Sequence, residues 1–98
     1  MALLQTFVDG RRGLRLGSLF GTPAVFAGRR VAIRLDGDAI DVRLAPAGRD
    51  LARTLLGGRV VAGPAASAWL RLSPPRDAQG VTAYLSVFER AVRDVVAA

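Results

Sequence analysis

Apolar and polar residues alternate most regularly in residues 31–35 and 40–44, which lie on either side of the sequence Asp36-Gly37-Asp38. In each segment every second residue is Val, Ile or Leu, and the positions between them are mostly charged. Period-two alternation on both sides of an Asp-Gly turn is typical of a β-hairpin with one buried face. We therefore predict two antiparallel strands here.

Two registers of this hairpin keep its apolar face intact, because they differ by two residues. If the Asp-Gly pair forms a type I′ loop, Arg30 falls opposite Arg43. If the following Gly-Asp pair forms a type II′ loop, Arg34 lies opposite Asp41 instead. We favour the second register because a cross-strand pair of opposite charges contributes up to about 1 kcal/mol.

Other strands are less clearly marked. Residues 24–27 are apolar throughout, as expected for a central strand, whereas residues 14–20 alternate poorly. Residues 68–72 form a further candidate strand, stopped by Pro74-Pro75. Residues 60–66 contain a Gly-Pro pair and indicate a loop or a poor strand.

Two segments near the ends of the chain have helical spacing. Residues 3–8 place four apolar residues over about two turns. In residues 81–96 the apolar positions step by four and three, which gives one continuous apolar face. Asp77 is suitably placed as an N-cap, and Glu89 with Arg93 forms an i,i+4 pair of opposite charges.

A third helix is predicted between Pro46 and Gly57-Gly58. Proline fits the first helical turn because its missing N–H is not needed there. A glycine pair commonly ends a helix. Leu51, Leu55 and Leu56 supply an apolar stripe, which we expect to be the buried face of this helix.

Together these elements predict a single two-layer α+β domain spanning residues 1–98. The expected order is α-β-β-β-α-β-α, with an antiparallel sheet of about four strands packed by helices. A length of 98 residues and a hydrophobic fraction of 51% suffice for one core. No apolar run approaches the roughly 18 residues of a membrane span, so we expect no membrane partner. Residues 1–6 lack the basic start of a signal peptide and the sequence has no cysteine, so we expect a cytoplasmic protein.

Charge is unevenly distributed along the chain. Lys, His, Cys and Asn are absent, so all 14 basic residues are arginine, and the net charge is +6. Residues 1–35 hold six arginines against a single acid, Asp9, a net charge of +5. Residues 36–98 are almost balanced, at +1. An arginine-only composition also fits a general compositional bias, so the position of the charge is more informative than its total.

Few side chains are suited to catalysis. Without Cys, His or Lys, a serine nucleophile would need activation by a carboxylate or by water, which is uncommon. The glycines of residues 10–17 lack the spacing of a phosphate-binding loop, and no lysine could complete one. Asp36, Asp38 and Asp41 could hold a hard cation, but Asp36 and Asp38 are better explained as turn residues and Asp41 as the partner of an arginine. We therefore predict no enzyme, no cofactor and no metal site.

Three motifs in the first half of the chain resemble a known family. They are Phe20-Gly21-Thr22-Pro23-Ala24, Gly28-Arg29-Arg30, and the Asp36-Gly37-Asp38 hairpin that leads into Ile-Asp-Val-Arg-Leu. This succession is similar to the N-terminal domain of TfoX-type competence regulators. There, a Met-Phe-Gly strand leads to a Gly-Arg/Lys turn and then to a strand that ends in Leu-Arg/Lys-Leu.

The second half of the chain extends this resemblance. Arg49-Asp50-Leu51-Ala52 and Ser67-Ala68-Trp69-Leu70 resemble segments of MmcQ/YjbR-type proteins and of the small "luciferase domain" family. The similarity covers roughly residues 14–96. Leu19 stands where the first family usually has Met, and the histidines of the luciferase-type group are absent. The resemblance implies an α+β fold with a curved antiparallel sheet and a regulatory or DNA-associated role.

The arginines of the first third are the candidate binding residues. Pairing of residues 14–20 with residues 24–27 would bring them to one edge of the sheet; they are Arg11, Arg12, Arg15, Arg29 and Arg30. Such an edge would contact the phosphates of a nucleic acid. A solvated arginine face, or the interface of a homodimer or other protein partner, would have the same composition.

Trp69 also has two interpretations. It either packs in the core between the sheet and the C-terminal helix, or offers a stacking platform for a base. We thus predict a non-enzymatic binding or regulatory domain associated with nucleic acid, with a homodimeric or protein-partner module as the alternative.

Overall fold

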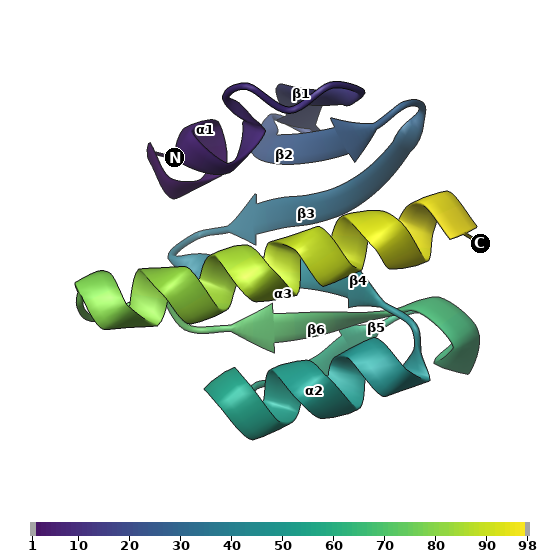
Figure 1. Cartoon of the computed structure of the whole chain (residues 1–98). Coiled ribbons are helices and arrows are strands. Elements are labelled where there is room, and N and C mark those ends of the chain that lie inside the picture. Colours follow the sequence, from purple (N-terminus) through teal and green to yellow (C-terminus); the bar gives the residue numbers. More distant parts are fainter. Residues whose placement is uncertain (1, 98) are drawn as a thin grey trace.

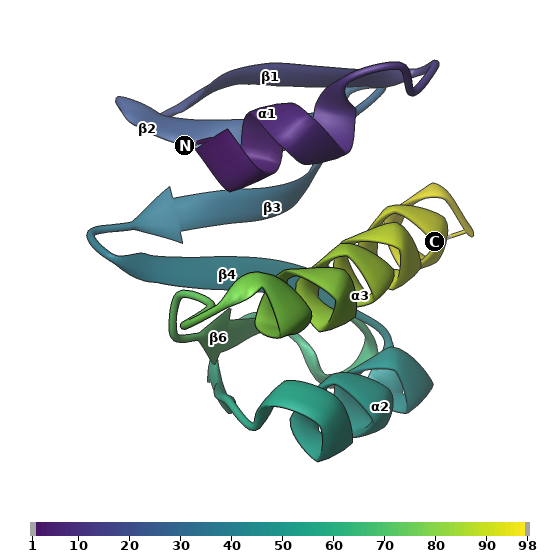
Figure 2. The same cartoon turned by 60° about the vertical axis from the view of Figure 1, so that its left-hand side comes forward.

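The protein is a two-layer α+β domain. The computed structural model describes residues 2–97; for residues 78 and 79 it describes the backbone but not the side chains. The elements are α1 (Ala2–Val8), β1 (Leu14–Leu19), β2 (Thr22–Ala27), β3 (Arg30–Asp36), β4 (Ala39–Leu44), α2 (Pro46–Leu56), β5 (Arg59–Ala62), the short 3-10 helix η1 (Ala65–Ser67), β6 (Ala68–Leu72) and α3 (Ala78–Ala97). The strands form one antiparallel sheet in the order β1-β2-β3-β4-β6-β5. Figures 1 and 2 show all three α-helices on the same side of it.

The predicted sheet of about four strands and the order α-β-β-β-α-β-α are wrong, although the α+β class is right. The sheet has six strands, four of them before α2. The alternation of β1 is interrupted by Gly17, where a Cβ would lie 3.0 Å from the ring of Phe26. β5 (Arg59–Ala62) covers the first part of residues 60–66, which the sequence indicated as a loop or a poor strand and which the predicted strand order left out. It is a bulged edge strand with mostly exposed residues, so burial imposes no alternation on it.

The favoured register of the β3–β4 hairpin is confirmed. Arg34 lies opposite Asp41 and Leu35 lies opposite Ile40, so the loop consists of two residues. Its first residue, Gly37, has a φ of 60°, as a type II′ turn requires.

The core lies between the sheet and the helices. Val25, Ile33, Val42 and Leu70 lie opposite one another on successive strands, and all four are fully buried. Phe88 of α3 packs on this layer and is fully buried as well. The sheet thereby gains one apolar face, as the period-two pattern predicts.

The C-terminal helix predicted over residues 81–96 is confirmed as α3. Asp77 caps its first turn, since Asp77 Oδ1 accepts a hydrogen bond from the Gly80 N–H at 2.8 Å. Glu89 forms an ion pair with Arg11, which lies in the loop after α1; Arg11 Nη2 is 2.6 Å from Glu89 Oε1. This ion pair takes Glu89 away from the predicted partner in its own helix.

The predicted buried face of α2 is wrong. Leu51 and Leu55 are 43% and 50% exposed, and Leu56 is partly buried. The residues that α2 buries are Gly48 and Ala52, one turn apart. Small side chains at these positions let α2 approach α3 closely, which a stripe of leucines would prevent.

A β-bulge separates β3 from β4 at one end of the sheet. The register between β2 and β3 shifts after Val25, and this leaves Ala32 as an extra residue in β3. Pairing between β3 and β4 runs from the hairpin loop to Ile33 opposite Val42. Figure 1 shows β3 curving toward β2 at this end. The first residues of β3 therefore diverge from the last residues of β4.

Candidate functional site

The face of the sheet opposite the helices, called the open face below, is lined by arginine. The register aligns one row of residues across all six strands, which runs Gly17, Ala24, Arg34, Asp41, Arg71 and Arg59. On the same face, Arg15 lies opposite Phe26, and Arg43 lies opposite Trp69. The open face thus carries a net charge of +3, which is the sum over five arginines and two aspartates: Arg15, Arg34, Arg43, Arg59 and Arg71, with Asp36 and Asp41.

Asp41 is fully buried at the centre of this row because arginines cover it. Its Oδ2 accepts a hydrogen bond from Arg34 Nε at 3.0 Å, and its Oδ1 accepts one from Arg71 Nε at 2.9 Å. Arg71 Nη2 also donates to Asp41 Oδ2 at 3.0 Å and to Asp36 Oδ2 at 2.5 Å. The arginines on both sides are thus fixed to one carboxylate.

The ionisation of this cluster follows from its geometry. Burial raises the pKa of Asp41, but the hydrogen bonds and positive charges of Arg71 and Arg34 lower it by more, so the net pKa lies below the ordinary value. The hydrogen bond to Asp41 raises the pKa of Arg71. Asp41 is therefore ionised at neutral pH.

Trp69 is only 6% exposed although it belongs to the open face. The guanidinium carbon of Arg34 lies 4.3 Å from the ring centroid, and that of Arg43 lies 5.6 Å from it. Both distances are within the range of cation–π contacts. Trp69 therefore packs beneath arginines on the open face, and not between the sheet and the C-terminal helix. A ligand on this face would therefore meet the flat guanidinium groups of the arginines and not the ring of Trp69.

A second arginine-on-aromatic pair lies at the β1–β2 end of the open face. The guanidinium carbon of Arg15 is 4.3 Å from the ring centroid of Phe26. Gly17 makes room for both groups, since a Cβ at this position would lie 3.0 Å from the ring and 3.0 Å from Arg15 Nη1. The interruption in the pattern of β1 is thus explained by the site.

Three of the five predicted arginines are brought together. Arg12, Arg29 and Arg30 line one cavity of about 540 Å³, with Val92 and Val96 of α3 on its other wall. The loop before β1 and the β2–β3 turn are joined by a hydrogen bond from the Gly28 N–H to the Gly13 carbonyl at 3.3 Å.

The other contacts of this group are structural. Arg11 is ion-paired with Glu89 and donates to the carbonyl of Phe7 at 3.0 Å. Arg30 Nη1 donates to the carbonyl of Val95 at 2.9 Å, near the end of α3, where a cation is favourable. Arg15 belongs to the open face. The predicted site is therefore divided between an edge and a face.

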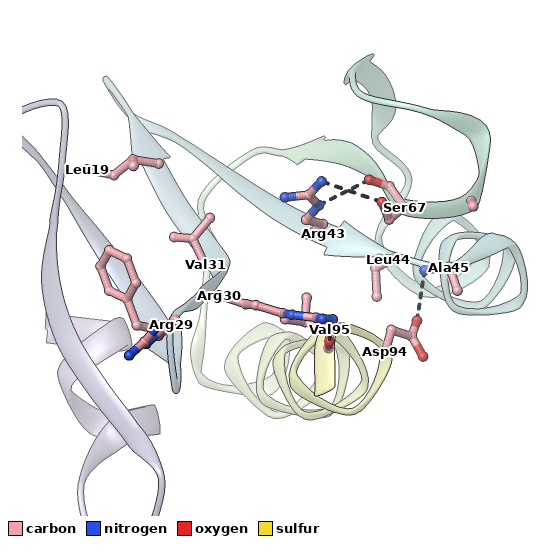
Figure 3. A pocket seen from close by; sticks show the side chains of 12 residues that line it. Leu19, Arg29, Arg30, Val31, Arg43, Leu44, Ala45, Ser67, Asp94 and Val95 are labelled. Carbon is pink, nitrogen blue, oxygen red and sulfur yellow. Dashed lines mark hydrogen bonds between the residues drawn. The ribbon is translucent and has the colours of Figure 1, made fainter. Parts of the chain in front are cut away.

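The divergence of β3 from β4 opens a cleft of about 460 Å³, called the β3–β4 cleft below. Figure 3 shows Leu19 and Val31 on one side of it and Arg43 and Ser67 on the other. Arg43 Nε donates to the Ser67 carbonyl at 3.2 Å, and its Nη2 lies 3.5 Å from Ser67 Oγ. The cleft thus combines an apolar wall with a polar one.

The sequence prediction misses Arg34, Arg43 and Arg71. A signal for them exists, because each occupies an intervening position of an alternating strand, between residues that face the core. Such positions lie on the other face of the sheet by period two alone. The prediction used Arg34 only as the cross-strand partner of Asp41, assigned no role to Arg43 or Arg71, and looked for the site in the arginines that follow the first helix and in the Gly28-Arg29-Arg30 turn.

The site presents guanidinium groups and aromatic rings, which are chemically suited to anions and to stacking. Within residues 2–97, no cluster of acidic side chains is arranged to hold a metal ion. Of the three aspartates considered for a cation, Asp36 and Asp41 are bonded to Arg71.

Within residues 2–97, no helix is both long and apolar enough to cross a membrane.

Comparisons with known proteins give no identification: no protein-family model matches the chain, and neither the curated proteins nor the solved structures yield a match. The resemblance to TfoX-type, YjbR-type and luciferase-domain proteins stays a prediction.

Proposed function

We propose that the protein is a non-enzymatic binding module for single-stranded nucleic acid, and that the strand lies on the open face. The observation that carries this proposal is the stacking of arginine on Trp69 and Phe26. Arg15 and Arg34 are held over the rings at 4.3 Å; Arg15 is exposed, and the side chain of Arg34 is 27% exposed. Unpaired bases stack on guanidinium planes as they do on aromatic rings.

The charge of the open face supports the same proposal. Arg59 stands directly opposite Arg71, a like-charge pair that disfavours folding. Two positive side chains directly opposite each other on adjacent strands are suited to phosphates instead. Arg12 and Arg29 lie in the loops beside β1 and β2, where they extend the positive surface past the end of the sheet. A regulatory role of the TfoX type would use such a surface.

The test is a titration of the protein with single-stranded RNA, single-stranded DNA and duplex DNA by fluorescence anisotropy. At about 50 mM salt we expect both single strands to bind and the duplex to bind more weakly, with an affinity that falls steeply as salt increases. Stronger binding of the duplex would contradict stacking on the open face. An absence of binding to all three at low salt would contradict the proposed function.

Two double variants with the same net charge locate the surface. We expect Arg15→Gln/Arg34→Gln to weaken binding of the single strand at least about tenfold, because it removes two stacking planes and two positive charges. Arg53→Gln/Arg93→Gln removes the same charge from exposed positions on α2 and α3. We expect this control to bind nearly as well as the native chain. Equal losses in both variants would show that only the total charge matters.

Phe20 favours self-association as a second candidate function. Its side chain is 99% exposed at the tip of the β1–β2 hairpin. Phe20 and Gly21 have φ values of 50° and 82°, as in a type I′ turn, a conformation that a bulky residue adopts only at a cost. A second copy of this chain that buries Phe20 would explain why the position is aromatic.

The variant Phe20→Asn tests this candidate. Asn-Gly is the preferred type I′ dipeptide, and no buried surface is lost, so we expect the free energy of unfolding to rise by about 1 kcal/mol in urea titrations. If the hairpin is a dimer interface, sedimentation should show a concentration-dependent dimer for the native chain and a monomer for the variant. A native chain that stays monomeric at all concentrations would contradict self-association.

A further inference from the structure

The β3–β4 cleft is distinct from the flat part of the open face. Its volume of about 460 Å³ falls within the range of small-molecule sites. It exists because the bulge at Ala32 ends the pairing of β3 with β4, and the C-terminal end of α3 closes it from behind. Figure 3 shows Arg30 and Val95 next to this helix, below Val31 and Arg43 in the view. The hollow is therefore built into the sheet.

The two walls of the cleft differ in chemistry. Leu19, Phe26 and Val31 line one wall with apolar side chains. Arg43 and Ser67 line the opposite wall, and the main-chain and hydroxyl oxygens of Ser67 hold the guanidinium at 3.2 and 3.5 Å. An occupant that matches both walls needs an apolar body and a polar group on one side.

The net charge of the cleft indicates whether the polar group of the occupant is positive or negative. Arg29, Arg30 and Arg43 line the cleft with a single acid, Asp94, so its net charge is +2. Both carboxylate oxygens of Asp94 are already in use: Oδ2 accepts the N–H of Ala45 at 2.9 Å, and Oδ1 accepts Arg90 Nε at 3.0 Å.

Arg43 is the cation best placed to bind an anion. Within residues 2–97 it forms no ion pair with a carboxylate, and its contacts to Ser67 are long. A guanidinium of this kind forms short, charge-assisted hydrogen bonds with a carboxylate or a phosphate.

From these observations we infer that the β3–β4 cleft binds a small organic anion with a flat, apolar body. The anionic group pairs with Arg43 and the Ser67 hydroxyl, and the flat body packs against Phe26 and Val31. An aromatic carboxylate and a nucleoside monophosphate share this chemistry. The cleft shares Phe26 and Arg43 with the open face, but its binding of a small anion does not depend on the binding of a nucleic-acid strand.

Matched probes test the inference and distinguish the two sources. The probes are 1-naphthoate with its neutral amide, AMP with adenosine, and inorganic phosphate, each titrated into the native chain and followed by amide NMR shifts. We expect one of the two organic anions to bind and to shift the amides of Val31, Arg43 and Ser67, while its neutral partner binds at least about tenfold more weakly. Binding of naphthoate alone indicates a carboxylate ligand, and binding of AMP alone indicates a nucleotide.

Variants locate the binding in the cleft. Arg43→Gln should lower the affinity for the anion at least about tenfold. Arg53→Gln replaces an exposed arginine of α2 and should leave the affinity unchanged. Val31→Phe keeps every charge but fills the cleft, so it should weaken the organic anion in the same way. Circular dichroism confirms that each variant is folded. The inference is overturned if neither anion binds at millimolar concentration, if a neutral partner binds equally well, or if both Arg43→Gln and Val31→Phe retain full affinity.

Discussion

Replacing Asp41 with asparagine is expected to lower the free energy of unfolding by about 2–3 kcal/mol. The carboxylate is fully buried and joins Arg34 and Arg71 through three hydrogen bonds. Breaking a buried ion pair from one side costs about 3–5 kcal/mol, since the partner charge is left uncompensated. Here the side chains of both arginines are 27% exposed, which lets water solvate part of their charge and reduces the cost. Urea titration at pH 7 measures the difference.

The same variant should show a characteristic dependence on pH. The pKa of Asp41 is lower in the folded chain than its ordinary value of about 3.9, so the folded state holds the ionised form more strongly. This stabilisation is complete above about pH 5 and is lost as the pH falls through the folded pKa. The difference between the native chain and Asp41→Asn should therefore be constant from neutral pH to about pH 5 and shrink at lower pH.

Asp50→Asn provides the control for both measurements. Asp50 is exposed on α2, so its replacement should change stability by no more than about 0.5 kcal/mol at neutral pH. If Asp41→Asn proved as mild as Asp50→Asn, the cluster of Asp41 with Arg34 and Arg71 would contribute little to folding. A difference that grew toward acid pH would contradict the lowered pKa.

The contrast between β3–β4 and β5 shows which parts of the fold can be read from the sequence. The hairpin is predictable in register because one face is buried, and opposite charges at Arg34 and Asp41 select between two otherwise equivalent pairings. β5 forms at an edge, where pairing with β6 supplies the stability and its side chains stay mostly exposed. A strand of this kind depends on a neighbour distant in sequence, and local patterning does not reveal it.

The site is predictable to a lesser degree than the fold. The sequence places positive charge in the first third, and the structure does gather Arg12, Arg29 and Arg30 around one cavity. The arginines of the open face depend on strand order, because Arg34 reaches Trp69 only when β4 and β6 are neighbours. That adjacency is a long-range property. The bulge at Ala32, which opens the β3–β4 cleft, likewise carries no glycine or proline signal.

The variant Gly48→Val tests why α2 buries small residues and not the predicted leucine stripe. A Cβ at Gly48 would lie 2.5 Å from Asp94 Oδ2 and 3.1 Å from Leu44 Cδ2, so α2 could not stay at its present distance from α3. The clash would displace the carboxylate that accepts the N–H of Ala45 at the start of α2. We expect overpacking and the lost hydrogen bond to lower the free energy of unfolding by about 3 kcal/mol in urea titrations.

Gly80→Ala in α3 tests whether this loss comes from the contact rather than from the removal of a glycine. A Cβ at Gly80 would lie 3.5 Å from its nearest neighbours, which is ordinary van der Waals contact. Alanine in a helix is favoured over glycine by about 0.5–1 kcal/mol, so this variant should be more stable than the native chain. Gly48→Ala shares the same intrinsic gain, and its clash with Asp94 should cancel that gain or reverse it. If Gly48→Ala were stabilised as much as Gly80→Ala, the close approach of α2 to α3 would not be what makes glycine necessary at position 48.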